Sequence, residues 1–249
     1  MVRNKTKKTK IGKVLDNVRP QLLLSDLSHA ASLERLGEKL FERIHWRALT
    51  DEPEIAITFD DGPHATSTPQ ILELLQQLNV PASFFLVGKH LEKYPEIACE
   101  MVGAGHEIGN HTFSHSLLYV STRNRIRNEI SRTDTLLRNI DGAEPKFFRP
   151  PAGFFTKQVL DIAGQLGYKT VVGDVYPRDP HLPGKKKIVD RVLQRTVAGS
   201  IIILHDGGNT QRVDRSQTLE ALSEIIPILK RKGFKFKTLS DLLLDQTNS

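Results

Sequence analysis

An acidic pair at the end of an apolar run is the first feature of this sequence that could do chemistry. Asp60 and Asp61 follow the run at 55–59, and two histidines, His111 and His115, come later in the chain. Adjacent carboxylates repel each other unless a positive charge neutralises one of them, as a cation bound to Asp61 would. One carboxylate and two imidazoles can hold a divalent cation with positions left open for water and substrate. Asp60 would then be free to take a proton from that water, which predicts a metal-assisted hydrolase.

The spacing of the two histidines is informative only in its context. His111 and His115 would bring both rings to one side if the chain turned helically after Asn110. Unrelated surface histidines often share this spacing, but here it follows a predicted strand and has an acidic pair upstream. The same ligand set would also suit a non-haem iron oxygenase, although that reading leaves Asp60 without a role.

A third histidine, His205, ends the apolar run at 201–204. Its simplest interpretation is a buried histidine bonded to a carbonyl. At the mouth of a barrel it would instead be a general acid, because an imidazole titrates near neutrality and can hand a proton to a departing amine.

These residues need a framework that brings strand ends together. From Glu54 onward, short β-rich runs alternate with longer helical patterns, which is typical of parallel strands connected by helices. Strands are expected at 54–59, 82–87, 106–110, 146–149, 168–173, 200–204 and 234–237, and helices at 67–78, 90–103, 121–139, 156–166, 185–197, 216–232 and 239–244. The candidate residues end or follow these strands, at the face where barrel enzymes carry their chemistry. The pattern predicts an α/β fold, a distorted (β/α)7-8 barrel.

The first fifty residues read differently from the rest. Six basic residues and no acidic one occur before residue 14, which is typical of a solvated terminus or of an arm attracted to an anionic polymer, membrane surface or cell wall. Apolar residues from 14 to about 50, Ile44 among them, recur at helical spacing. We therefore expect a basic arm and helical extension at 1–50 and a catalytic domain at 51–249.

Composition narrows the class of protein. Hydrophobic residues make up 39% and charged residues 26% of the 249 residues, so the chain can bury a core and is not disordered by composition. Its apolar runs are too short to span a bilayer, and no secretory signal is recognisable. Cys99 is the only cysteine, so an internal disulfide is excluded. No nucleic-acid partner is expected, and the oligomeric state stays open.

Taken together, these motifs show that the sequence resembles the polysaccharide deacetylases of the NodB-homology type, carbohydrate esterase family 4. The resemblance covers roughly residues 53 to 243. Thr58-Phe59-Asp60-Asp61-Gly62-Pro63 matches the first motif of that family, and His111-Thr112-Phe113-Ser114-His115 matches the second. Arg149-Pro150-Pro151-Ala152-Gly153 resembles the third, and Leu204-His205 the fifth. The resemblance implies the same distorted barrel.

The resemblance also implies roles for individual residues. Asp60 would be the general base, paired with Arg149, and His205 the general acid, oriented by Asp179. One divalent metal ion would be held by Asp61, His111 and His115, with Zn²⁺ expected first and Co²⁺, Ni²⁺, Fe²⁺ or Mn²⁺ as alternatives. Substrate and oxyanion contacts would fall to Pro151 and Ala152, whose backbone N–H can bind an oxyanion.

Two positions depart from the family pattern. Ala152 stands where an aromatic residue is usual, and Pro180 stands where a tryptophan usually follows the aspartate. The residues expected to carry out the reaction match the family pattern, whereas the surface expected to contact the sugar differs from it. Phe154, Phe155, Tyr176 and His181 are candidates for a substitute wall.

The implied activity is removal of N-acetyl groups from the amino sugars of a peptidoglycan-like or chitin-like glycan. An amidase or deacylase acting on a small molecule or lipid-linked sugar is an alternative, as is a glycan-binding protein that has lost turnover. The lack of a recognisable signal favours the cytoplasm over the cell envelope, whereas the usual substrates of the family lie outside the cell.

Overall fold

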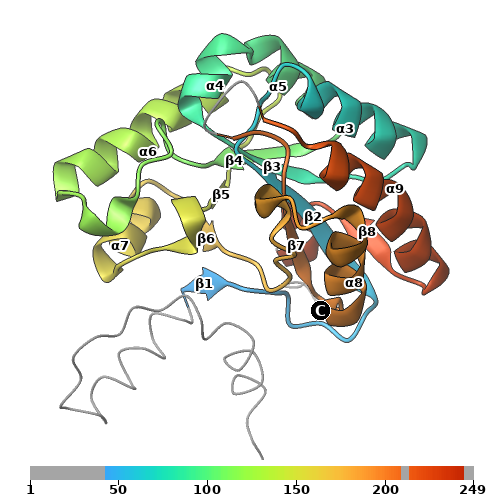
Figure 1. The fold of residues 1–249 in the computed structure, drawn as a ribbon. Helices are drawn as coiled ribbons and strands as arrows, with labels where there is room; N and C mark the ends of the chain where they lie inside the picture. Colours follow the sequence, from blue (N-terminus) through green and yellow to red (C-terminus); the bar gives the residue numbers. More distant parts are fainter. Residues whose placement is uncertain (1–42, 209–212, 244–249) are drawn as a thin grey trace, which may run out of the picture.

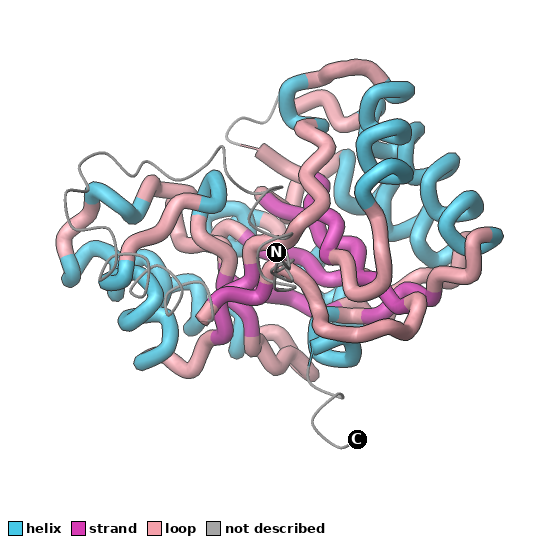
Figure 2. The backbone as a smooth tube through the Cα atoms, turned by 90° about the horizontal axis from the view of Figure 1, so that it is seen from below, coloured by secondary structure: helices cyan, strands magenta, loops and turns pink. Residues whose placement is uncertain are grey.

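The computed structural model describes residues 43–208 and 213–243. Within these residues the strands form one eight-stranded sheet, in the order β1-β6-β5-β4-β3-β2-β7 with β8 also paired to β2. Every paired ladder is parallel. Figures 1 and 2 show the strands gathered at the centre with helices around them. The α/β fold predicted from the alternating pattern is confirmed.

Each strand expected from Glu54 onward is present. The strands are β2 (Glu54–Asp60), β3 (Ser83–Leu86), β4 (Glu107–Asn110), β5 (Phe147–Phe148), β6 (Lys169–Val171), β7 (Ile201–His205) and β8 (Lys235–Lys237). The helices are α3 (Ser67–Gln77), α4 (Gly88–Lys93), α5 (Pro95–Gly103), α6 (Arg123–Arg138), α7 (Lys157–Gln165), α8 (Lys185–Arg195), α9 (Ser216–Arg231) and α10 (Leu239–Leu243).

The single helix expected at 90–103 is two helices. Tyr94, between α4 and α5, has φ −134° and ψ 56°, and Pro95 is the first residue of α5. Proline disfavours the helical conformation in the residue before it but is well suited to the first helical position. The chain therefore breaks at Tyr94 and restarts at Pro95.

The helical extension expected up to about residue 50 is wrong for its last residues. Ile44–His45 forms a short strand, β1, which pairs with β6 through Ile44 and Thr170. Ile44 is buried against Leu160 and Val172, so its apolar character comes from a place in the sheet. The sheet thus begins before residue 51, where the domain boundary was expected. The basic arm and the rest of the extension lie outside the described residues.

The sheet curls into a distorted barrel whose two ends meet through isolated contacts. Val175, beyond β6, forms a single bridge with Ile202 of β7, and Ile203 donates its N–H to the Val175 carbonyl at 2.9 Å. On the β1 side, the Ala48 N–H donates to the Gly199 carbonyl at 2.8 Å. No continuous ladder joins β6 to β7 in the described structure, so closure here depends on a few bonds.

Alternation along the strands decides which residues reach the site. Ile55, Ile57 and Phe59 of β2 pack with the helices in the main core. Ala56 faces the other way, into a second cluster that includes Leu239 and Leu242 of α10. Successive side chains of a strand point to opposite faces, so Thr58 and Asp60 share the inward face of Ala56. Because side chains alternate along β2, Asp60, the last residue of the strand, points inward at the open end of the barrel. None of the described helices is long and apolar enough to cross a membrane.

Candidate active site

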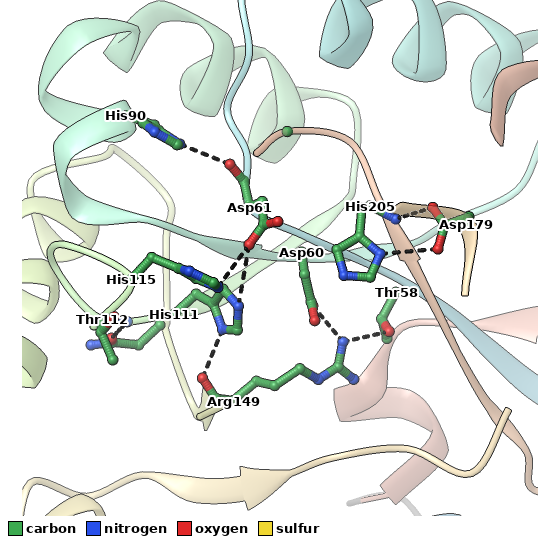
Figure 3. Close-up of polar contacts among 12 residues, drawn as sticks. Thr58, Asp60, Asp61, His90, His111, Thr112, His115, Arg149, Asp179 and His205 are labelled. Carbon is green, nitrogen blue, oxygen red and sulfur yellow. Dashed lines mark hydrogen bonds and ion pairs between the residues drawn. The ribbon is translucent and has the colours of Figure 1, made fainter. Parts of the chain in front are cut away.

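The candidate residues gather at the carboxyl ends of the strands (Figure 3). Asp60 ends β2 and lies in register with His205, which ends the adjacent strand β7. His111 directly follows β4, and Arg149 directly follows β5. Parallel strands bring these positions to one edge of the barrel, as the sequence pattern predicted.

Asp61, His111 and His115 converge as a set of metal ligands would. One Asp61 oxygen, Oδ1, lies 3.1 Å from His115 Nε2 and 3.6 Å from His111 Nε2. The three candidate ligand atoms lie within 4.8 Å of one another. This Asp61 oxygen is buried and accepts no hydrogen bond from the described residues, which is a costly arrangement without a cation. The donor set therefore fits one divalent metal ion.

The protonation of these groups also suits a cation. The Nδ1 of His111 lies 2.7 Å from the Arg149 carbonyl oxygen, which can only accept, so Nδ1 carries the proton. The Nε2 of a neutral His111 then presents its lone pair toward Asp61, an orientation common in metal-binding histidines. When the imidazoles are protonated instead, burial still opposes ionisation of Asp61, but contacts with His111 and His115 outweigh burial and hold the pKa of Asp61 well below its usual value. Asp61 thus carries the negative charge that suits a cation.

A tight loop, not a helical turn, brings the two histidines together. Residues 111–117 contain no helix, so a helical turn after Asn110 is not what brings the two rings to one side. Thr112 and His115 instead have φ values of 69° and 55°, in the left-handed region that side chains disfavour. Asp61 and Ala152 share this strain, with φ values of 74° and 56°. Backbone strain that persists in this way is typical of functional sites.

The general-base candidate has a buried positive partner. Arg149 Nη1 lies 2.6 Å from Asp60 Oδ1 and also donates to Thr58 Oγ1 at 2.8 Å. The guanidinium packs over the Phe85 ring with Cζ 4.0 Å from the ring centre. Because only 2% of Arg149 is exposed, this pair is shielded from water. Arg149 therefore holds the Asp60 carboxylate in a fixed orientation.

His205 and Asp179 form a second pair on the opposite side of the site. The Nδ1 of His205 lies 3.0 Å from Asp179 Oδ1, and the His205 backbone N–H donates to Asp179 Oδ2 at 3.0 Å. Thr218 also donates to Asp179 Oδ2 at 3.0 Å. Burial acts to lower the pKa of His205, but the charge and hydrogen bond of Asp179 outweigh it and the pKa is raised. The ring is thus oriented through Nδ1, with Nε2 available to a substrate.

The third motif forms a short turn beside Arg149. Pro151–Gly153 is a single 3-10 turn in which Ala152 is exposed and Pro151 is buried. Proline has no N–H, so the donor expected for an oxyanion is the Ala152 N–H. Pro151 can contribute only its shape and the path of the chain.

The aromatic candidates separate clearly. The Tyr176 ring lies 6.0 Å from the His205 ring, centre to centre. Phe154 pairs instead with Tyr119 at 5.4 Å, and Phe155 packs against Trp46 at 6.4 Å. His181 is exposed in the 3-10 turn Asp179–His181. Of these candidates, Tyr176 is the one with a ring contact to a candidate catalytic residue. Tyr119, the partner of Phe154, is an aromatic residue that the sequence pattern did not single out.

His90 is a further residue beside the site that the sequence pattern did not single out. His90 is only partly exposed, and its Nδ1 donates to the Asp61 carbonyl oxygen at 2.8 Å. Asp206, passed over beside His205, is fully buried and accepts a hydrogen bond from Thr68 at 2.6 Å. Neither contact has a local sequence signal, because each partner lies far away along the chain.

Comparison with known proteins agrees with this geometry. A family model described as polysaccharide deacetylase matches residues 47–171. A peptidoglycan-N-acetylglucosamine deacetylase of Bacillus cereus is 40% identical over 210 residues, covering 80% of this chain and 92% of that protein. A chitooligosaccharide deacetylase of Sinorhizobium fredii is 36% identical over 200 residues, covering 78% of this chain and 93% of that protein.

The fold comparison gives the same relationship. A crystal structure of the Bc1960 peptidoglycan N-acetylglucosamine deacetylase matches with a TM-score of 0.77 and 35% identity, over 81% of this chain and 92% of that chain. In each of these comparisons, the aligned region covers most of this chain and most of the relative. The chain therefore belongs to the polysaccharide deacetylase family, a family of metal-dependent enzymes that hydrolyse N-acetyl amide bonds in glycans.

Proposed function

We propose that this enzyme removes N-acetyl groups from N-acetylglucosamine residues of a peptidoglycan-like or chitin-like glycan. The observation that carries the proposal is that a candidate base, a candidate acid and three candidate metal ligands lie together at one end of the barrel. Asp60 is free to act as a base beside the three candidate ligands Asp61, His111 and His115. His205, with a raised pKa, ends the neighbouring strand and is suited to act as the acid. The named substrates of the relatives support this choice.

The metal ion would be held by Asp61, His111 and His115, with Zn²⁺ favoured by the two imidazoles and Co²⁺, Ni²⁺, Fe²⁺ or Mn²⁺ as alternatives. When bound, such an ion polarises the acetyl carbonyl and lowers the pKa of water. The chain's own residues supply the proton transfers and the orientation.

Asp60 takes a proton from the attacking water, held in place by the 2.6 Å contact with Arg149. The Ala152 N–H donates to the oxygen of the acetyl carbonyl as negative charge develops on it. His205 then donates the Nε2 proton to the departing amine, while Asp179 stabilises the imidazolium and fixes the ring. Acetate and a free amino sugar are the products.

The proposal is tested by acetate release from N-acetylglucosamine oligomers and from peptidoglycan. Wild-type protein loaded with metal is compared with Asp60→Asn and with Asp141→Asn, a control at an exposed aspartate. We expect Asp60→Asn to lose about a hundredfold or more in kcat, because general-base catalysis typically contributes 10²–10⁴-fold. Its metal content should remain that of the wild type, and Asp141→Asn should release acetate normally.

Other results lead to the alternatives. No acetate from either polymer, despite one bound metal per chain, would favour an amidase acting on a small molecule or lipid-linked sugar. A wild type and an Asp60→Asn variant that both bind oligosaccharide without turnover would indicate a glycan-binding protein. Activity with the redox-inert Zn²⁺ excludes an oxygenase, since oxygen activation needs a redox-active metal.

A further inference from the structure

Glu129, in the middle of α6, is a buried carboxylate whose position needs an explanation. Only 7% of the residue is exposed. Among the described residues no lysine or arginine forms an ion pair with it. Arg132, three residues further along the same helix, instead pairs with Glu92 at 3.6 Å and lies over the Phe113 ring. A buried carboxylate without a cationic partner is stable only if hydrogen bonds replace its water.

Among the described residues, the three hydrogen bonds to the Glu129 carboxylate all come from the loop between His111 and His115. Oε2 accepts the Phe113 N–H at 3.1 Å and the Ser114 N–H at 2.8 Å. Oε1 accepts the Ser114 hydroxyl at 2.7 Å. The carboxylate therefore satisfies two consecutive backbone donors that no regular secondary structure satisfies.

The opposite side of the same loop is held by α4. The Gly88 N–H donates to the Thr112 carbonyl and the Lys89 N–H to the Phe113 carbonyl, each at 2.9 Å. The Asn110 side chain accepts the Thr112 N–H at 3.0 Å. The loop is thus clamped between two helices, with α4 binding its carbonyls and Glu129 binding its N–H groups.

This clamp acts where the backbone is strained. Thr112 and His115, which flank the segment held by Glu129, are in the left-handed region. Such conformations persist only when the surroundings hold them. Without Glu129, the N–H groups of buried Phe113 and half-buried Ser114 would lose their acceptor in the protein, and the loop would relax toward an unstrained path that separates the two imidazoles.

We propose that Glu129 is a positioning residue for the metal site, holding residues 113–114 so that His111 and His115 face Asp61 together. The inference depends on the proposed metal role of these three residues. Glu129 acts through the loop backbone and touches neither the metal nor the substrate.

The experiment measures Zn²⁺ affinity of the full chain, without substrate, by competition with a chromophoric chelator. We expect Glu129→Ala to bind Zn²⁺ about ten- to a hundredfold more weakly, the usual effect of removing a residue that orients metal ligands. Glu129→Gln should bind as the wild type does, because an amide oxygen still accepts both backbone N–H groups and the amide nitrogen can donate to the Ser114 hydroxyl.

Glu107→Ala is the matched control. Glu107 also accepts bonds from serine hydroxyls and a backbone N–H, from Ser83 and Ser240, but it lies at the start of β4, at the other end of the barrel. This variant should lower the thermal midpoint without changing Zn²⁺ affinity. If Glu129→Ala does not fold, Glu129→Asp replaces it, since the shorter side chain cannot span the same donors.

The outcomes separate the two claims. A wild type that binds no Zn²⁺ overturns the metal site and, with it, the role of Glu129. Wild-type affinity in Glu129→Ala or Glu129→Asp, with only a lower thermal midpoint, leaves the metal site standing and reduces Glu129 to a structural role. A loss in Glu129→Gln as large as in Glu129→Ala would contradict the hydrogen-bonding argument.

Discussion

Asp60 and Asp61 are identical side chains in adjacent positions, yet their surroundings differ. Asp60 lies on the inward face of β2 and meets Arg149. Asp61 comes after the strand, where a φ of 74° turns the chain so that its carboxylate meets His111 and His115. One carboxylate is thereby suited to proton transfer and the other to metal binding.

The pairing of His205 with Asp179 predicts a pH effect. His205 acts as an acid only when protonated, so activity should fall as pH rises through its pKa. Asp179 raises that pKa despite burial. In Asp179→Asn this support is lost, and the alkaline limb of the kcat/KM profile should move to lower pH, measured by acetate release across pH at saturating metal. An alkaline limb that stays in place would assign it to another group.

Replacing Arg149 by lysine, a change that is often regarded as conservative, should reduce catalytic activity. Its Nη1 bonds both Asp60 and Thr58, and its planar group packs on Phe85. Lysine has no planar fork, so Arg149→Lys should misplace Asp60 and reduce kcat by roughly ten- to a hundredfold. Zn²⁺ affinity should be unchanged in the chelator competition. A parallel loss of Zn²⁺ affinity would instead indicate that Arg149 supports His111 through its backbone carbonyl.

At the scale of elements, the site depends on how closely the strand-end loops approach. The loop after β7 passes directly against the loop after β2, where Gly207 lies beside Asp61 and Gly62. The N–H groups of Asp206 and Gly207 both donate to the Asp60 carbonyl, at 3.1 Å and 3.4 Å. This contact aligns the strand that ends in His205 with the strand that ends in Asp60.

Gly207→Ala tests this approach. An added Cβ would overlap the Asp61 carbonyl and lie 2.8 Å from the Gly62 nitrogen, both backbone atoms that cannot move aside easily. We expect a loss of about 1–3 kcal/mol in the free energy of unfolding, measured in urea, together with weaker Zn²⁺ binding. Gly103→Ala is the control, since a Cβ there meets no atom within 4 Å. Unchanged stability in Gly207→Ala would mean that the two loops can separate without cost.

At the scale of the whole molecule, Asp206 links stability to pH. It is fully buried beneath the site, where the loops after β2 and β7 meet the start of α3. Burial raises its pKa to about 7. An acid whose pKa is raised on folding binds more protons in the folded state than in the unfolded state, so stability falls as pH rises from about 4 to 7.

This contribution should disappear in Asp206→Asn. Between pH 4 and 8, Asp206 should lower the free energy of unfolding by at most about 4 kcal/mol, because each unit of pKa shift corresponds to about 1.36 kcal/mol. Urea unfolding of the chelator-treated protein at pH 5 and pH 8 measures it without interference from metal binding. The variant should lose less stability than the wild type between these two pH values. Equal losses would show that Asp206 stays protonated or that other groups dominate.

From residue 54 onward, apart from the division of the helix expected at 90–103, the sequence by itself determined the order and type of the strands and helices and the residues at the strand ends. Strand and helix periods are local, so the parallel α/β pattern and the positions of Asp60, His111, Arg149 and His205 could be predicted from neighbouring residues alone. The break at Pro95 was also locally encoded, although the apolar spacing concealed it.

Only the tertiary structure decided how these residues meet. Three features of the site could not be predicted from neighbouring residues. They are the left-handed loop at Thr112 and His115, the hydrogen bonds from that loop to Glu129, and the contact between His90 and Asp61. The assignment of Ile44 to a strand likewise depends on β6, more than a hundred residues away along the chain. Hydrogen bonds between distant segments depend on how the barrel closes, and that closure is a property of the whole chain.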